Sequence, residues 1–148
     1  MWLSRQFFIL MLMAFICQAC SNNPQKKIYT SECATDVKFK QISFVNLIDS
    51  VTFYDKQYVE LSGTYVEGKH LSALVNDSAF ADNGHSFWVN FTQDCPLYSS
   101  ASHQGLFDLG NNINNHAMTI RGRVELSNKG DQKAYRATIN EVSYLVLY

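Results

Sequence analysis

Several stretches of the chain alternate between apolar and polar residues, and this two-residue period predicts β-strands. The clearest stretch is residues 58–66, YVELSGTYV, where Val59, Leu61 and Tyr65 share one face. Successive side chains of a strand point to opposite faces of a sheet, so Glu60, Ser62 and Thr64 are expected on the other face. Gly63 interrupts the stretch, and a glycine inside a strand marks a bend, a bulge or a close backbone approach. We therefore expect one long, bent strand.

Four further stretches carry the strand pattern, at residues 70–75, 85–92, 117–124 and 134–148. The first of them follows the turn sequence EGKH, so we expect it to form a hairpin with residues 58–66. In residues 117–124, AMTIRGRV, Gly122 takes the place that Gly63 has in the first strand. The two glycines therefore predict two corners of a small barrel. Residues 43–49 instead have apolar side chains at helical spacing and predict a short helix.

The segment between the third and fourth predicted strands, residues 93–116, breaks the strand pattern. Cys95-Pro96 ends the third strand, and the Ser-, Asn- and Gly-containing stretch that follows predicts a loop over the barrel's open end. Five strands, two of them with internal glycines, and an insert at this position resemble the layout of an OB-fold barrel. This resemblance covers residues 41–148 and implies an all-β domain with one or two short helices. A β-sandwich of the immunoglobulin type, which needs about seven strands, is the alternative.

The N-terminal residues predict a targeting segment. Arg5 precedes an apolar run of ten residues, FFILMLMAFI at 7–16. A membrane-spanning helix needs roughly 20 apolar residues, so a secretory signal peptide over residues 1–19 is the better interpretation. Residues 20–40 begin with a polar stretch and predict a tether, which leaves residues 41–148 as the folded domain.

The end of the apolar run carries a second signal. Residues 17–20, CQAC, are mostly small, and the polar sequence SNN follows them. This resembles the lipobox of bacterial lipoproteins, which implies cleavage after Ala19 and acylation of Cys20. The family usually has Leu where this chain has Cys17, and Cys17 with Ala19 also fits the small-x-small site of an ordinary signal peptidase. The resemblance is to small exported lipoproteins with an OB-like domain and no assigned activity. It implies a lipid anchor in the bacterial cell envelope, which would be in the outer membrane if the cell is Gram-negative.

The cysteine count fits this interpretation. The chain has four cysteines, and Cys17 would leave with the signal peptide. Acylation of Cys20 then leaves Cys33 and Cys95 as an even pair, which predicts a disulfide in an oxidising compartment. Two free thiols are the alternative, because a sequence does not supply the Cα separation that a disulfide requires.

Composition and charge narrow the function classes. Apolar residues make up 47% of the chain, which is enough for a buried core. From residue 36 onward the chain has nine Lys and Arg residues and twelve Asp and Glu residues, which gives a net charge of −3. Nucleic-acid-binding domains usually carry a basic surface, because phosphate contacts supply most of their non-specific affinity. Binding to single-stranded nucleic acid, which many OB domains perform, is therefore only an alternative function.

No motif in the sequence predicts catalysis, a metal or a cofactor. The histidines are His70, His85, His103 and His116, and their spacings match no metal-ligand pattern. The chain lacks the GxSxG sequence of a nucleophile elbow. We therefore expect a protein that is not an enzyme, with an envelope hydrolase kept as a further alternative.

The aromatic and basic residues on the predicted strands are the candidate binding residues. Trp88 lies opposite the apolar face of its strand, so it points outward if that face is the core. Tyr58 or Tyr65 is expected beside it, and Arg121 and Arg123 in the same region would complete a mixed aromatic and cationic patch. The alternative is that the insert covers Trp88. The sequence thus predicts a binding module for an envelope protein, a peptide or a glycan.

Overall fold

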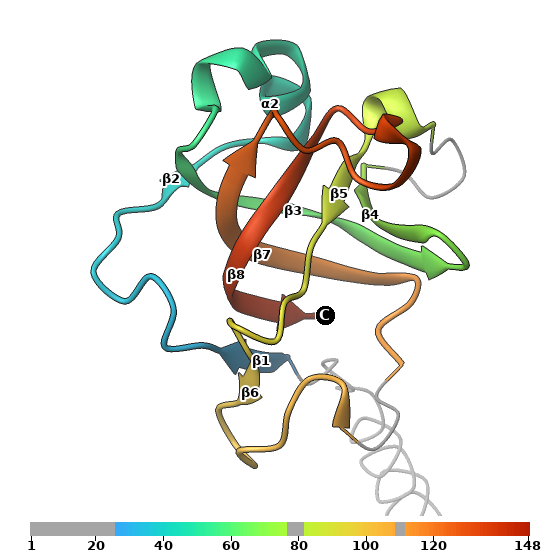
Figure 1. Ribbon diagram of the computed structural model, residues 1–148. Coiled ribbons are helices and arrows are strands. Elements are labelled where there is room, and N and C mark those ends of the chain that lie inside the picture. Colours follow the sequence, from blue (N-terminus) through green and yellow to red (C-terminus); the bar gives the residue numbers. More distant parts are fainter. Residues whose placement is uncertain (1–25, 77–81, 109–111) are drawn as a thin grey trace, which may run out of the picture.

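The structure is a computed structural model, and it describes residues 26–76, 82–108 and 112–148 of the 148. Most of the described residues lie in strands or in the loops between them (Figure 1). The strands are β1 (Lys27–Thr30), β2 (Lys40–Gln41), β3 (Tyr58–Gly68), β4 (Leu71–Val75), β5 (Phe87–Val89), β6 (Tyr98–Ser99), β7 (His116–Glu125) and β8 (Ala137–Leu147). The helical elements are α2 (Phe44–Ser50) and the 3₁₀ turns η1 (Val51–Tyr54), η3 (Asn83–His85) and η5 (Asp131–Lys133).

Five of these strands close into a barrel. Strand β3 pairs with β4, and β4 pairs with β5, both antiparallel. Strand β5 runs parallel to β8, which pairs antiparallel with β7, and β7 returns to β3. The order β3-β4-β5-β8-β7-β3 has no free edge, as in an OB-fold barrel. The chain is therefore an all-β, OB-like barrel, and the predicted fold class is confirmed.

The predicted strands lie where the alternation placed them, and β4, β5 and β8 are shorter than predicted. The predicted hairpin is present, with Tyr65 opposite Leu74. The stretch at 85–92 holds only the three residues of β5, with His85 at the end of η3 and residues 90–92 outside any strand. Strand β8 begins at Ala137, three residues after the predicted start. A sandwich of two sheets is ruled out because the sheet closes on itself.

The core fills the barrel, and α2 closes one end of it. Val59, Leu61 and Tyr65, the three residues predicted to share a face of β3, are all at most 2% exposed. The helix begins at Ser43, whose hydroxyl oxygen accepts a hydrogen bond from the Asn46 N–H at 3.3 Å. Phe44 then packs edge to face on Phe87 inside the barrel, with ring centroids 5.2 Å apart.

Gly63 and Gly122 lie at points where neighbouring strands come too close for a side chain. A Cβ atom on Gly63 would lie 2.7 Å from the Val75 carbonyl oxygen. A Cβ atom on Gly122 would lie 2.6 Å from Ile139 Cγ2, where the register between β7 and β8 shifts. Both glycines therefore allow the close strand contacts that a small barrel needs.

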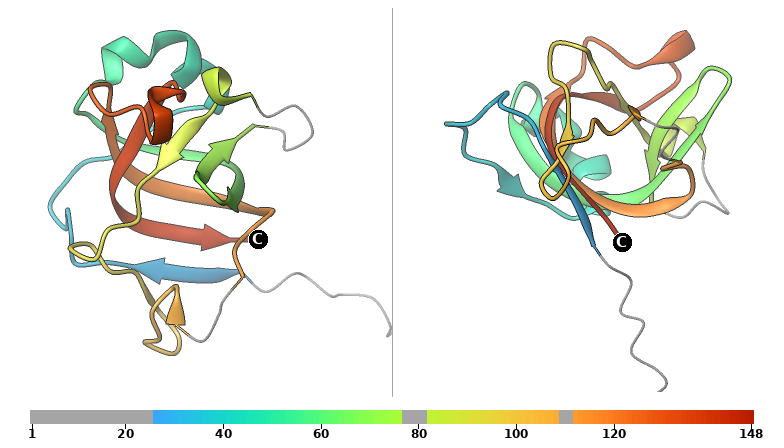
Figure 2. Two further views of the ribbon diagram at one scale, coloured as in Figure 1. Left: turned by 45° about the vertical axis from the view of Figure 1, so that its right-hand side comes forward. Right: turned by 90° about the horizontal axis from the view of Figure 1, so that it is seen from below.

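Part of the segment predicted as a tether belongs to the sheet. Residues 27–30 form β1, which pairs with the end of β8 and with β6, at the end of the barrel opposite α2 (Figure 2). The folded part thus begins at residue 27 or earlier, ahead of the predicted boundary at 41. The predicted pair Cys33 and Cys95 is also present, with their sulfur atoms 2.08 Å apart and their Cα atoms 5.7 Å apart. This disulfide ties the chain after β1 to the start of the insert.

The insert contributes to the core and also exposes apolar residues. Leu97, Leu106 and Ile113 are at most 5% exposed and belong to the main hydrophobic cluster. Phe107 packs on Phe91 with 5.4 Å between ring centroids, yet 56% of it is exposed. The predicted signal peptide and Cys20 lie outside the described residues. Within the described ranges, the structure has no helix of the length and apolar character that spanning a membrane requires.

Candidate functional site

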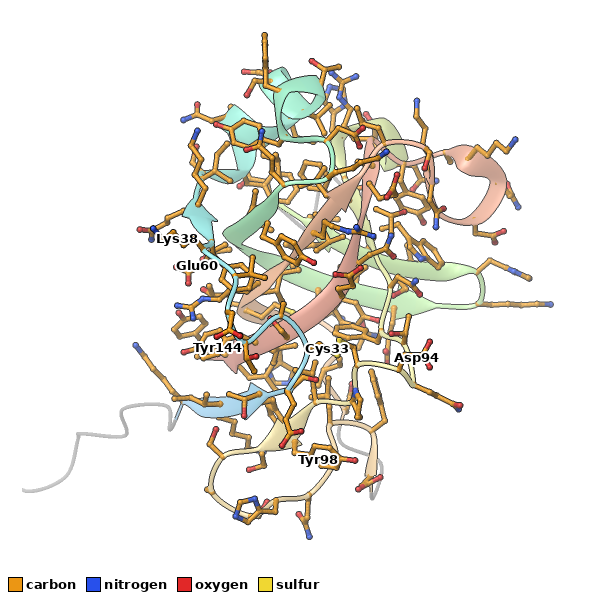
Figure 3. All side chains as sticks on the ribbon, turned by 60° about the vertical axis from the view of Figure 1, so that its left-hand side comes forward. Cys33, Lys38, Glu60, Asp94, Tyr98 and Tyr144 are labelled. Carbon is orange, nitrogen blue, oxygen red and sulfur yellow. A yellow bond between two sulfur atoms is a disulfide. The ribbon has the colours of Figure 1, made fainter. Side chains whose placement is uncertain are left out.

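The outer surface of β3, β7 and β8 carries a cluster of arginine, glutamate and aromatic side chains. It is called the arginine face here and consists of Phe39, Tyr58, Glu60, Arg121, Arg123, Glu141 and Tyr144. The arginines point outward because Ile120, Gly122 and Val124 occupy the inward positions of β7. The strand register places Arg121 between Glu60 of β3 and Tyr144 of β8. Figure 3 shows Glu60 and Tyr144 on one side of the barrel, beside the segment that carries Lys38.

Arg121 is held from three sides. Its Nε donates a hydrogen bond to Glu60 Oε2 at 2.6 Å. The guanidinium carbon lies 4.4 Å from the centroid of the Tyr144 ring and 5.5 Å from that of Phe39. Such contacts fix a guanidinium through the negative face of the rings. The Arg121 side chain nevertheless keeps 39% of its surface exposed, so a partner molecule can reach it.

Arg123 belongs to a second, neighbouring network. Its Nη2 lies 2.9 Å from Glu141 Oε1 and 3.9 Å from Glu125 Oε2. The Tyr58 hydroxyl donates a hydrogen bond to the other oxygen of Glu141. This bond, with a smaller effect of burial, raises the pKa of Tyr58. Tyr58 is therefore a neutral hydrogen-bond donor at physiological pH.

The arginine face is close to electrically neutral. Its two arginines face Glu60 and Glu141, and Glu125 lies at the edge of the cluster. Arginines that already pair with carboxylates have less capacity for phosphate groups, and the face offers no continuous basic stripe. This arrangement disfavours a nucleic-acid backbone and suits a neutral or mixed-charge partner.

Trp88 lies elsewhere, under the connection between β7 and β8. Its ring packs edge to face on Tyr135, with 5.1 Å between centroids, and Gly130 lies directly against it. Ala73 and Val75 complete this second hydrophobic cluster on the outside of the barrel. The cover over Trp88 thus comes from residues 126–136, whereas the sequence analysis offered only the insert as a possible cover.

This placement partly covers the face that OB barrels commonly use. Ligands of such barrels bind on the second and third barrel strands, here β4 and β5, between two flanking loops. In this chain one of those loops lies on the face itself. His70, in the other loop, places its Nδ1 3.1 Å from Asp131 Oδ2, so the two loops touch above β4. The usual binding face is therefore partly covered by the protein's own residues, and Trp88 is half-buried.

Tyr65 is a core residue. It is 2% exposed, and its hydroxyl shares a 3.0 Å hydrogen bond with the Ser72 hydroxyl. Its ring also packs on Phe91, with centroids 5.6 Å apart. The four predicted binding residues thus occupy three different places: Arg121 and Arg123 share the arginine face, Trp88 lies below the β7–β8 connection, and Tyr65 lies inside the barrel.

Sequence reasoning missed four members of the arginine face, namely Phe39, Glu60, Glu141 and Tyr144. Glu60 was recognisable as an outward residue, because it alternates with Val59 and Leu61. Tyr144 could not be matched to Arg121, since β8 carries an irregularity at Glu141, whose φ of 51° interrupts the alternation. Phe39 lies in the segment predicted as a tether.

The histidines form no metal site among the described residues. The structure shows no group of three or more His, Cys, Asp or Glu side chains placed to hold an ion in those ranges. His85 instead lies beside Asp82, with 2.7 Å between Nδ1 and Oδ2. This hydrogen bond lowers the pKa of Asp82, which is an exposed carboxyl at the start of η3.

Comparison with known proteins provides no independent assignment. No family model matches the chain, and neither a curated protein nor a solved structure does.

Proposed function

We propose that this protein is a lipid-anchored lipoprotein of the bacterial cell envelope, and that its OB-like barrel is a non-enzymatic binding module for a protein, a peptide or a glycan. Two independent features support the two parts of this proposal. The CQAC sequence before a polar stretch supports the anchor. The arginine face supports the binding role.

The observation that carries the binding role is the position of Arg121. The guanidinium lies between Tyr144 and Phe39 and is bonded to Glu60, so its orientation is set before a partner arrives. A side chain that is already ordered loses little conformational freedom on binding. The hydrogen bond to Glu60 uses one of the five N–H donors of a guanidinium, and part of the side chain remains exposed. A partially exposed, ordered donor flanked by rings suits sugar hydroxyls and peptide carbonyls.

The neutral surroundings favour the same partner classes. Sugars and peptides offer hydrogen-bond acceptors and apolar C–H surfaces, and aromatic rings provide a matching contact. The disulfide between Cys33 and Cys95 is consistent with localisation in the cell envelope, since disulfides persist in oxidising compartments.

The anchor is tested by metabolic labelling with a palmitate analogue in a bacterial host. We expect the full-length protein to incorporate the label and to partition into detergent. The variant Cys20→Ala should lose both properties while keeping the same folded barrel. Equal labelling of the two proteins, or labelling of neither, contradicts the anchor.

The binding role is tested by photo-crosslinking from the arginine face. Ser62 is exposed on β3, two residues beyond Glu60, so a photoreactive amino acid at this position leaves the cluster intact. We expect a specific protein adduct, or cosedimentation with purified peptidoglycan if the partner is a glycan. The same probe at Phe53, which is 77% exposed on η1, is the positional control. Arg121→Ala should abolish the signal from position 62, and a signal that survives this change contradicts the proposal.

A further inference from the structure

The exposed apolar side chains gather at one end of the barrel. Six large apolar residues of the described chain expose more than a third of their surface. Four of them lie around β1, β6 and the insert. These four are Ile28, Tyr98, Phe107 and Tyr148, with exposed fractions of 39%, 48%, 56% and 45%. The other two, Val45 and Phe53, belong to α2 and η1 at the opposite end (Figure 1).

The four residues lie on segments that pair with or contact one another. The backbone N–H of Ser100 donates to the Ile28 carbonyl at 2.9 Å, which joins the insert to β1. A hollow of about 450 Å³ lies between them, lined by Lys26, Lys27 and Ile28 on one side and by residues 99–102 and Gln104 on the other. A second hollow of about 240 Å³ runs between Tyr98 and Phe107. The name anchor end is used below for Lys26, Lys27, Ile28, Tyr98, Phe107 and Tyr148.

The charges of this surface are unusual for a protein of net negative charge. Residues 96–107 contain no Asp, Glu, Lys or Arg. The acidic groups beside them are Asp108, which lines the hollow beside Phe107, and Glu32 and Asp94, which line a hollow with Tyr98. The two lysines of the anchor end lie beside this uncharged loop, and Lys26 Nζ lies 5.0 Å from the centroid of the Tyr148 ring. Tyrosine and phenylalanine at the edge of an apolar surface, with lysines nearby, are typical of groups that lie at a membrane–water interface.

The position of the proposed lipid on the chain indicates that the partner of this surface is the lipid bilayer. Lys26 is the sixth residue after Cys20, so six residue steps connect their Cα atoms. A fully extended chain of that length spans about 20 Å, at about 3.3–3.6 Å per residue. A lipid on Cys20 therefore keeps the anchor end close to the bilayer. A short tether of this kind raises the effective concentration of the surface, so even weak contacts become populated.

We infer that the barrel docks on the lipid bilayer through its anchor end, so that α2 and η1 point away from the membrane. Ile28 and Phe107 contact the upper acyl region, and Tyr98 and Tyr148 lie among the head groups. Lys26 and Lys27 attract anionic lipid. This inference rests on the proposed lipid anchor, and it adds a defined orientation that the anchor alone does not provide.

The test uses the full lipidated protein in vesicles that contain brominated, anionic lipid. Trp88 is the single tryptophan of the chain after residue 19, so the emission of the parent protein can be subtracted. Bromine quenches a tryptophan only at short range. We expect Phe107→Trp to lose most of its added emission, and Tyr98→Trp to repeat the result if the first variant folds poorly. Phe53→Trp, equally apolar but at the far end, is the matched control and should keep its emission.

Each outcome decides one of the two proposals. Vesicle flotation reports the lipid anchor, and failure to float overturns the anchor together with the docking that depends on it. Flotation without quenching at positions 107 and 98 leaves the anchor in place and overturns the docking. Equal quenching at position 53 also overturns it, because the barrel then has no fixed orientation. If a partner protein or a second copy of the chain covered this surface, the tryptophan at position 107 would be shielded from solvent but would not be quenched by bromine. This result also overturns the docking.

The lysines provide a second measurement. A lysine near an anionic membrane contributes about 1 kcal/mol, so each change to Gln at positions 26 and 27 should lower the docking equilibrium about fivefold. The quenching of Phe107→Trp should therefore fall in the double variant on anionic vesicles, and it should change little on neutral ones. An identical response on both vesicle types contradicts the contribution of the lysines.

Discussion

Gly130 lies directly against the indole of Trp88, and a Cβ atom on Gly130 would lie 2.6 Å from Trp88 Cγ. Gly130 also has φ 68° and ψ −160°, a conformation that glycine alone adopts readily. The connection between β7 and β8 can therefore lie flat on the outer face of β5. Gly130 thus lets this connection partly cover the face on which OB barrels commonly bind their ligands, and the arginine face is the more accessible candidate.

The variant Gly130→Ala should lower the free energy of unfolding by about 1–3 kcal/mol, because the added methyl group meets the indole and the backbone is strained. Urea unfolding followed by Trp88 fluorescence measures this loss. The emission of the folded variant should also shift to longer wavelength, since the cover over Trp88 has to move.

Gly68→Ala is the matched control for this change. A Cβ atom on Gly68 would meet only Leu71, at an ordinary distance of 3.8 Å. We expect a change within about 0.5 kcal/mol, as for an ordinary surface substitution. Equal losses from both variants would contradict the specific contact between Gly130 and Trp88.

Gly122→Ala tests the barrel corner on β7. The added methyl group would lie 2.6 Å from Ile139 Cγ2 and 2.8 Å from the Asn140 carbonyl oxygen. Overpacking of this kind costs about 1–3 kcal/mol, measured by urea unfolding. Ile139→Ala removes one of the two clashing groups, so it should cost less in the Gly122→Ala background than in the parent protein. Purely additive losses in this double-mutant cycle would show that the clash with Ile139 is absent.

The barrel strands could be predicted from the sequence because the alternation follows directly from one buried and one exposed face. Val59 and Leu61 show this, since both are core residues on the shared face. Tyr65 lies on the same face and is buried as well, although it was predicted as a binding residue. Strand β1 was missed because its four residues bury only Tyr29, so no period is visible. Its place in the sheet depends on long-range pairing with β8, which a local pattern does not encode.

The candidate site was only partly predictable. The outward direction of Arg121 and Arg123 follows from the alternation across Gly122. Their partners depend on which residue of β8 lies opposite, and the register shift between Arg121 and Arg123 breaks simple counting. The cover over Trp88 depends on the backbone conformation of one turn at Gly130. The sequence NKGD predicts a turn there, but it does not predict the direction in which the chain continues after the turn.

Reduction of the disulfide should destabilise the protein. The bond between Cys33 and Cys95 closes a loop with a sequence separation of 62 residues. Its loss should cost about 2–4 kcal/mol in the free energy of unfolding, chiefly because the unfolded chain gains freedom. Urea unfolding with and without reductant measures the difference. The double variant Cys33→Ala/Cys95→Ala should be insensitive to reductant, and a parent protein that is equally insensitive would contradict a structural bond.

The hydrogen bond from Tyr58 to Glu141 should make stability depend on pH in the alkaline range. The bond to the carboxylate raises the pKa of Tyr58 in the folded protein above the ordinary value of about 10. Below pH 10 the hydroxyl keeps its proton in both states, so its contribution is complete. As the pH rises further, the unfolded chain loses this proton first, and the contribution is lost as the pH passes through the folded pKa.

Burial also raises the pKa of Tyr65 and Tyr135, so the effect of Tyr58 has to be isolated by difference. The free energy of unfolding of the parent protein and of Tyr58→Phe should be compared from pH 7 upward. We expect the parent to be the more stable protein at neutral pH and the gap to narrow above pH 10, because phenylalanine has no proton to lose. A gap that stays constant, or that widens with pH, would show that Tyr58 does not donate to Glu141. Since the same carboxylate pairs with Arg123, that result would also remove the support for one half of the arginine face.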